Sequence, residues 1–202
     1  SYLDVDRFPL CNTWSDLMAQ VTTLFKDEHR FKTVVLDTTD AVSNLCEQNI
    51  CEAQKWDSIQ APGWGKGQAI LRMEWAHLLD ALNALRVGKQ MNVILLSHVE
   101  AKIFSHPKIG DFNRFEMRCD KNVNALIKDW VDFNFFADYE MTKVSDKQER
   151  KERAIAYGDR RMYTKYSAYF DAKARLALPE ELELKWESFA DAYTKALSNQ
   201  QS

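Results

Sequence analysis

The sequence contains few glycines, and none of them forms a phosphate-binding loop. Only six glycines occur among the 202 residues. The P-loop motif GxxxxGK[ST] requires a Gly-Lys pair followed by Ser or Thr, because its backbone N–H groups surround the phosphates and its hydroxyl group binds Mg²⁺. The two Gly-Lys pairs, at residues 65–66 and 88–89, are followed by Gly67 and Gln90. The 202 residues therefore contain no P-loop. Since the sequence also begins without Met, we expect a first strand and a phosphate loop upstream of it.

Long apolar runs, paired cysteines and a strong net charge are also missing. No hydrophobic run approaches the roughly 20 residues that a membrane span requires, and the N-terminus is not a signal peptide. We therefore expect a cytoplasmic protein that does not bind membranes. The four cysteines show no CxxC pairing, which predicts reduced thiols rather than a metal site or a disulfide framework. The formal charge of -3 gives no overall attraction to nucleic acid, so any such binding must be local.

The sequence does contain enough apolar residues for a hydrophobic core. With 46% hydrophobic residues, we predict one domain over residues 1–202. Periodic hydrophobic residues predict a helix that begins at Thr13 and further helices at 41–53, 68–87, 121–130 and 186–197. Residues 132–141 predict a long strand, and the charged run at 144–153 predicts a solvated loop. The loop at 56–67 either presents Trp64 and Lys66 to a ligand or is a Pro-Gly turn into the next helix; we slightly favour the turn.

Two hydrophobic runs end abruptly in polar residues. Residues 31–37 end in Asp37, and residues 91–96 are followed by Ser97 and His98. Such short runs are typical of strands that are buried on both faces of a parallel sheet. The helical pattern between them predicts a β-α-β unit of an α/β fold. Ligands of these sheets bind at the carboxyl ends of the strands, so we predict that Asp37, Ser97 and His98 lie at a binding site.

Asp37 is the candidate magnesium-binding residue. A hydrophobic strand that ends in Asp is the pattern of a Walker B motif, whose carboxylate holds Mg²⁺ or a water bound to it. The alternative, that Asp37 caps the following helix, is about as common. Ser97 or His98 could sense a γ-phosphate and Lys102 could stabilise its charge, although a lone His is usually a structural group.

Residues 103–118 combine aromatic and cationic side chains. Bases of single-stranded nucleic acid stack on aromatic rings while cations neutralise its phosphates. This pattern indicates a DNA-binding segment, and the alternative of a surface hairpin with one face of its rings buried is at least as common. The candidate DNA-binding residues are Phe104, Lys108, Phe112, Arg114, Phe115 and Arg118.

Lys173 and Arg175 are a second pair of candidate functional cations. On an extended segment, residues two apart point to the same side. Two such cations can reach a nucleotide that a neighbouring subunit binds, as an in-trans finger. They can equally be surface charges.

Several segments together resemble a known family. The likeness, which runs in order over nearly the whole sequence, is to the phage-encoded AAA/RecA-like nucleotide-binding proteins, some of which are single-strand annealing recombinases. The segments that carry it are residues 3–9, 33–40, 65–67, 91–98 with Lys102, 170–173 with Arg175, and 178–181.

The resemblance implies a fold and a set of roles. The fold is a RecA-like P-loop NTPase core, with a mainly parallel sheet flanked by helices and with the N-terminal P-loop portion absent. By position, Asp37 matches the Walker B acid, Ser97 and His98 the polar end of the sensor strand, and Lys173 with Arg175 the K-x-R finger. The implied cofactor is Mg-ATP.

The resemblance also implies partners and a place of action. The partners are single-stranded DNA, further copies of the chain in a ring or filament, and a single-strand-binding protein, all in the cytoplasm of the bacterial host. The family's phosphate loop, and with it a catalytic Glu, precedes residue 3, so we expect this polypeptide to bind ATP poorly or not at all.

Two functional hypotheses therefore remain from the sequence. In the first, the intact protein is an ATP-dependent enzyme that anneals DNA strands in phage recombination. In the second, the chain is a non-catalytic DNA-binding or assembly module that keeps the RecA-like fold without ATP turnover. An upstream GxxxxGK[ST] segment would favour the first hypothesis.

Overall fold

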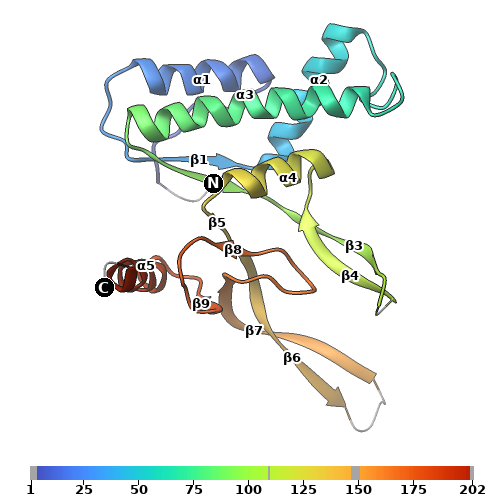
Figure 1. Cartoon of the computed structure of the whole chain (residues 1–202), viewed down its shortest axis with the longest axis vertical. Helices are drawn as coiled ribbons and strands as arrows, with labels where there is room; N and C mark the ends of the chain where they lie inside the picture. Colours follow the sequence, from blue (N-terminus) through green and yellow to red (C-terminus); the bar gives the residue numbers. More distant parts are fainter. Residues whose placement is uncertain (1–3, 109, 147–150, 201–202) are drawn as a thin grey trace. The chain divides into compact units, whose positions relative to one another are not determined.

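The computed structural model describes residues 4–108, 110–146 and 151–200 (Figure 1). The chain divides into two compact units. The first comprises residues 1–100 and 117–130, and the second comprises residues 101–116 and 131–202. None of the helices in the described ranges combines the length and the hydrophobicity that crossing a bilayer requires.

Four helices build the first unit, and all four were predicted. They are α1 (Trp14–Lys26), α2 (Thr39–Gln54), α3 (Lys66–Gly88) and α4 (Lys121–Trp130). Helix α1 begins with a capping box, in which the Thr13 hydroxyl accepts the N–H of Asp16 and the Asp16 carboxylate accepts the N–H of Thr13. Helix α3 is central, since it contacts α1, α2 and α4 (Figure 1). Its predicted apolar stripe is fully buried and consists of Leu71, Trp75, Leu78, Leu82 and Leu85.

The two predicted strands pair with each other in the first unit. Strand β1 (Thr33–Asp37) and strand β2 (Asn92–Leu96) are parallel, and their register runs from Thr33 opposite Asn92 to Asp37 opposite Leu96. The connection between them passes through α2 and α3, which confirms the predicted β-α-β unit.

The sheet is smaller and more open than predicted. Strands β1 and β2 form a two-stranded sheet, and each alternates between more buried and more exposed residues. Val35, Ile94 and Leu96 are exposed on one face, so the prediction of strands buried on both faces is wrong. A hydrophobic run predicts a strand, but its burial depends on which other elements cover the sheet. The mixed α/β class is confirmed, whereas the described residues contain no large, mainly parallel sheet.

The second unit is built mainly of small sheets. Strands β3 (Val99–His106) and β4 (Gly110–Met117) pair with each other and contribute residues 101–116. Strand β5 (Phe133–Asn134) is antiparallel to β8 (Lys173–Ala174). A three-stranded antiparallel sheet has the order β6 (Phe136–Asp146), β7 (Lys151–Tyr163), β9 (Glu181–Glu183), and α5 (Trp186–Gln200) follows it.

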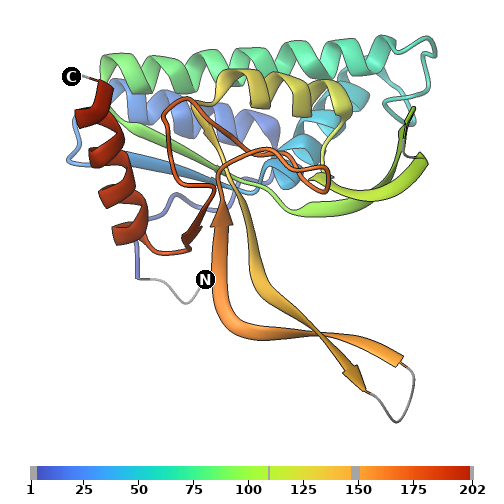
Figure 2. The ribbon, with the colours of Figure 1, turned by 60° about the horizontal axis from the view of Figure 1, so that its bottom comes forward.

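A long ribbon replaces part of the loop predicted at residues 144–153. Figure 2 shows β6 and β7 running side by side as an extended pair. The predicted strand at 132–141 thus continues to Asp146, and β7 begins at Lys151. Only residues 147–150 of the predicted loop lie outside the described residues. The charged run was misleading because the backbone hydrogen bonds of a ladder do not depend on side-chain polarity.

Candidate functional site

The carboxyl ends of β1 and β2 bring the predicted site residues together. Asp37 is the last residue of β1 and lies opposite Leu96, so Ser97 and His98 follow directly on the neighbouring strand. The Asp37 side chain is exposed, and no hydrogen bond or ion pair joins its carboxylate to another described residue. The Ser97 hydroxyl donates to the backbone carbonyl of His98 at 3.0 Å. The predicted juxtaposition of the two strand ends is confirmed.

Asp37 does not cap the following helix. The N-cap of α2 is Thr38, whose side chain accepts a hydrogen bond from the backbone N–H of Ala41 at 3.4 Å. The capping alternative for Asp37 is therefore wrong, and its carboxylate is directed into solvent at the edge of the sheet.

Asp40 is a residue of this edge that the sequence analysis missed. It lies in the first turn of α2, and its Oδ2 atom is 3.0 Å from Nδ1 of His98. Its Oδ1 atom also accepts the backbone N–H of His98 at 3.3 Å. The Asp40 side chain is 16% exposed and the His98 side chain is 64% exposed. Asp40 thus fixes both the backbone and the ring of His98 while leaving most of the imidazole accessible.

The environment of Asp40 keeps it ionised. Burial acts to raise its pKa, but hydrogen bonds from Thr38, from the side chain and backbone of His98 and from its own backbone outweigh burial. Together they lower the pKa of Asp40 to about 2. Its carboxylate is therefore a permanent acceptor for His98 near neutral pH.

A half-buried thiol lies beside this edge in the first unit. The Cys119 Sγ atom is 3.5 Å from the hydroxyl oxygens of Thr39 and Ser43 on α2. Burial raises the pKa of Cys119, so the group stays a thiol. All four cysteines lie in described residues and none forms a disulfide.

The edge fits a magnesium ion that is held mainly through its waters. Mg²⁺ keeps several waters and often takes only one or two carboxylates from the protein. Asp37 supplies one exposed carboxylate at the strand end. Within the described ranges, no three His, Cys, Asp or Glu side chains cluster as a complete metal cage would require.

The chain matches one family model. The model, which describes an AAA domain, covers residues 1–176. The chain belongs to the AAA domain family. AAA domains generally bind nucleotides, and the match includes Asp37, Ser97 and His98 as well as residues of both compact units. Neither a curated protein nor a solved structure matches the chain.

The predicted DNA-binding residues of this AAA domain lie in three settings. Phe104 and Phe112 of the β3–β4 pair have ring centroids 5.5 Å apart, and Lys108 is exposed in the turn between the two strands. Phe115 stacks on Phe136 with ring centroids 5.4 Å apart, and Phe115 is 39% exposed. Arg118 is exposed and belongs to the first unit, where its backbone N–H donates to the carbonyl of His98.

Arg114 lies in the interior of the second unit. Its side chain donates to the hydroxyl of Tyr166 and forms an ion pair with Asp171. Burial acts to lower the pKa of Arg114, but the hydrogen bond to Tyr166 and the charge of Asp171 raise it. The DNA-binding role of Arg114 stays a prediction, and this placement gives it no support.

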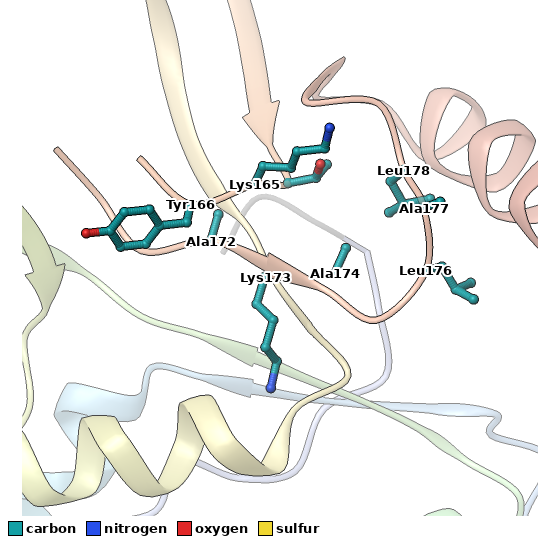
Figure 3. A pocket seen from close by; sticks show the side chains of 9 residues that line it. Lys165, Tyr166, Ala172, Lys173, Ala174, Leu176, Ala177 and Leu178 are labelled. Atoms are coloured by element: carbon teal, nitrogen blue, oxygen red, sulfur yellow. The ribbon is translucent and has the colours of Figure 1, made fainter. Parts of the chain in front are cut away.

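The remaining predicted cations also belong to the second unit. Lys102 lies on β3, and its role in stabilising a γ-phosphate stays a prediction. Arg175 is exposed and forms an ion pair of 2.8 Å with Asp132. Lys173 lines a small pocket of about 260 Å³, and in Figure 3 its ammonium group points away from that of Lys165. The role of Lys173 and Arg175 as an in-trans finger likewise stays a prediction.

A larger groove lies at the predicted glycine-rich loop. It has a volume of about 570 Å³, and Trp64 beside it is fully exposed. The side chains of Gln60, Gln68 and Asn122 give the groove a polar lining. Trp64 is exposed to solvent, and the loop turns into α3 at Lys66, as the favoured alternative predicts; presentation of Trp64 and Lys66 to a ligand stays a prediction.

Proposed function

We propose that this AAA domain uses Mg-ATP, at the carboxyl ends of β1 and β2, to control its binding of single-stranded DNA during phage recombination. The observation that supports it most is the parallel, in-register pairing that brings Asp37 beside Ser97 and His98. Membership of the AAA family supports the binding of a nucleotide. A RecA-like arrangement of the complete nucleotide site is part of this proposal.

Each residue of the edge has a distinct task. Asp37 would hold Mg²⁺ through a bound water, since its carboxylate is exposed and forms no hydrogen bond or ion pair with a described residue. The bound ion would neutralise the charge of the nucleotide phosphates. His98, oriented by Asp40, and Ser97 would contact the terminal phosphate and report its presence along β2.

Oligomers would complete the site. Lys173 and Arg175 of one subunit would reach the nucleotide of the next, in a ring or a filament on DNA. The exposed Arg175, paired with Asp132 in a surface ion pair, can exchange that weak partner for a phosphate at little cost. A single-strand-binding protein would supply the DNA to such an oligomer.

The DNA would bind on the second unit. Phe104 and Phe112 offer ring surface and Lys108 offers a cation in the same β3–β4 pair. Phe115 on β4 belongs to the same predicted set, whereas Arg118 lies in the first unit. Because the formal net charge is -3, binding must depend on such a local surface.

One observation favours the second candidate function, a DNA-binding or assembly module without ATP turnover. The 202 residues contain no GxxxxGK[ST] motif, which P-loop proteins need to hold phosphates. In this case the chain would bind DNA with the same affinity whether or not Mg-ATP is present.

The substitution Asp37→Asn tests the nucleotide role. Because the 202 residues lack a P-loop, Mg-ATP is added at high concentration. We expect it to change the affinity of the wild-type chain for a labelled oligo(dT), and we expect Asp37→Asn to reduce that change at least tenfold. The matched control is Glu52→Gln, which neutralises an exposed carboxylate on α2 of the same unit. Fluorescence anisotropy measures both affinities.

Three outcomes separate the hypotheses. The proposal is supported if Mg-ATP changes the DNA affinity of the wild type and of Glu52→Gln but not that of Asp37→Asn. DNA binding without any response to Mg-ATP supports the module. A response that survives Asp37→Asn contradicts the assignment of Asp37 to the metal.

A further inference from the structure

Arg114 joins two segments of the second unit that are distant in sequence. Its guanidinium carbon lies 5.5 Å from the ring centroid of Phe104 and 4.8 Å from that of Tyr166. It also donates to the Tyr166 hydroxyl at 2.9 Å and pairs with Asp171. Arg114 is only 5% exposed. These contacts cover one face of the Phe104 ring and one face of the Tyr166 ring, and they hold the guanidinium group inside the unit.

Two further aromatic rings lie next to the pair that contacts this arginine. Phe112 lies 5.5 Å from Phe104 and 6.2 Å from Tyr169, measured between ring centroids. Tyr166 is 66% exposed and Tyr169 is 63% exposed, so both rings present surface to solvent. Since Arg114 covers one face of Tyr166, its exposed surface includes the opposite face.

The segment that carries the two tyrosines is held by its backbone. The carbonyl of Tyr169 accepts the N–H of Phe115 at 2.7 Å, and the N–H of Tyr169 donates to the Ser167 hydroxyl at 3.3 Å. Phe115 also forms an isolated parallel bridge with Phe170. The Tyr169 side chain can therefore be removed without breaking these contacts, whereas removal of the Tyr166 side chain also removes a hydrogen-bond acceptor of Arg114.

A lysine and a histidine accompany the ring of Phe104 along β3. Side chains alternate between the two sides of a strand, so Lys102, Phe104 and His106 lie on the same side. Exposed rings flanked by cations fit single-stranded nucleic acid, whose bases offer flat faces and whose backbone offers phosphates. An apolar protein partner would instead require a continuous hydrophobic patch without charges at its centre.

We propose that Tyr166 and Tyr169 complete, with Phe104 and Phe112, a platform on which the bases of single-stranded DNA stack, and that Arg114 is a positioning residue beneath it. This inference rests on the proposed DNA-binding function and adds two residues to it. It also changes the task of Arg114 from a phosphate contact to the support of two rings.

Tyr169→Ala and Tyr166→Ala test the platform. Each is compared with Tyr139→Ala, a tyrosine of the same unit that is 50% exposed and lies on β6. Binding is measured by anisotropy to labelled oligo(dT) and to an abasic oligomer of the same length, which keeps the phosphates and lacks the bases. Loss of one stacked base should weaken oligo(dT) binding roughly 5- to 150-fold, while binding of the abasic oligomer stays unchanged.

The two oligomers separate the possible results. If the wild type binds oligo(dT) but both tyrosine variants bind it equally well, the platform is wrong and DNA binding stands. An equal loss on both oligomers also overturns the platform, because stacking requires bases. If the wild type binds neither oligomer, the proposed DNA-binding function fails and the platform fails with it.

A salt series distinguishes the role of Arg114 from that of Lys108. A phosphate contact to a single strand contributes about 0.7 to the slope of log affinity against log salt. We expect Lys108→Gln to lower this slope by about 0.7. Arg114→Gln should leave the slope unchanged and reduce the preference for oligo(dT) over the abasic oligomer. A lower slope for Arg114→Gln would show that Arg114 contacts a phosphate, which would overturn its positioning role.

Discussion

Substituting Gly67 by Ala should destabilise the first unit strongly, although Ala is the better helix former. Gly67 is buried in the first turn of α3. A Cβ atom there would lie 1.9 Å from the carbonyl oxygen of Ile59 and 2.9 Å from its carbonyl carbon. Both distances are far below the roughly 3.5 Å of an ordinary contact. The obstacle is backbone, so a side-chain rotation cannot relieve it.

The magnitude follows from two opposing effects. Overpacking costs about 1 to 3 kcal/mol, and a clash with backbone belongs at the upper end of that range. Replacing Gly by Ala inside a helix contributes up to about 1 kcal/mol in the other direction. We therefore expect Gly67→Ala to lower the free energy of unfolding by about 2 kcal/mol.

Gly88→Ala is the matched control in the same helix. Its Cβ would meet Cε2 of Phe25 at 3.0 Å, and Phe25 is an exposed ring that can move aside. We expect a change of less than about 1 kcal/mol. Urea denaturation, followed by circular dichroism, measures the stability of both variants. The midpoint urea concentrations can be compared if the dependence of the unfolding free energy on urea has the same slope in both. Equal midpoints for the two variants would refute the close packing of the loop against α3.

Two further substitutions test local contacts of the first unit. Asp40→Asn removes the carboxylate that holds His98. Because folding lowers the pKa of Asp40 from 3.8 to about 2, its ionised form stabilises the chain above about pH 4, and this contribution is lost as the pH falls through about 2. At neutral pH the free energy of unfolding of the wild type should exceed that of Asp40→Asn by about 1 to 2 kcal/mol. If this difference stays constant down to about pH 2, the stabilisation by ionised Asp40 is contradicted. Thr13→Ala removes the α1 cap and should cost about 1 kcal/mol in urea denaturation. Thr23→Ala, at an exposed position of the same helix, should cost almost nothing, and similar losses for both would exclude a role for the cap.

Local patterns were sufficient to predict the helices and the paired strands of the first unit. The apolar stripe of α3 repeats at helical spacing, and the capping residues of α1 lie within four positions of one another. The pairing of β1 with β2 followed from the β-α-β order alone. The open face at Val35 and Ile94 was not predictable, because burial depends on elements that are distant in sequence.

The candidate site was predictable only in part, for the same physical reason. Asp37 and His98 were found because each ends a hydrophobic run. The contact between Asp40 and His98 joins residues 58 positions apart, and no local pattern indicates it. Arg114 looked like a phosphate contact among aromatic residues. Its acceptor, Asp171, lies 57 positions away and cannot be recognised from the surrounding segment.

The most direct test is the affinity of the unmodified chain for labelled oligo(dT), measured by anisotropy across a salt series with and without Mg-ATP. A nucleotide-controlled DNA-binding AAA domain predicts salt-sensitive binding whose affinity changes when Mg-ATP is added. Affinity that is the same with and without Mg-ATP at every salt concentration would contradict nucleotide control. No binding at all would contradict the DNA-binding function itself.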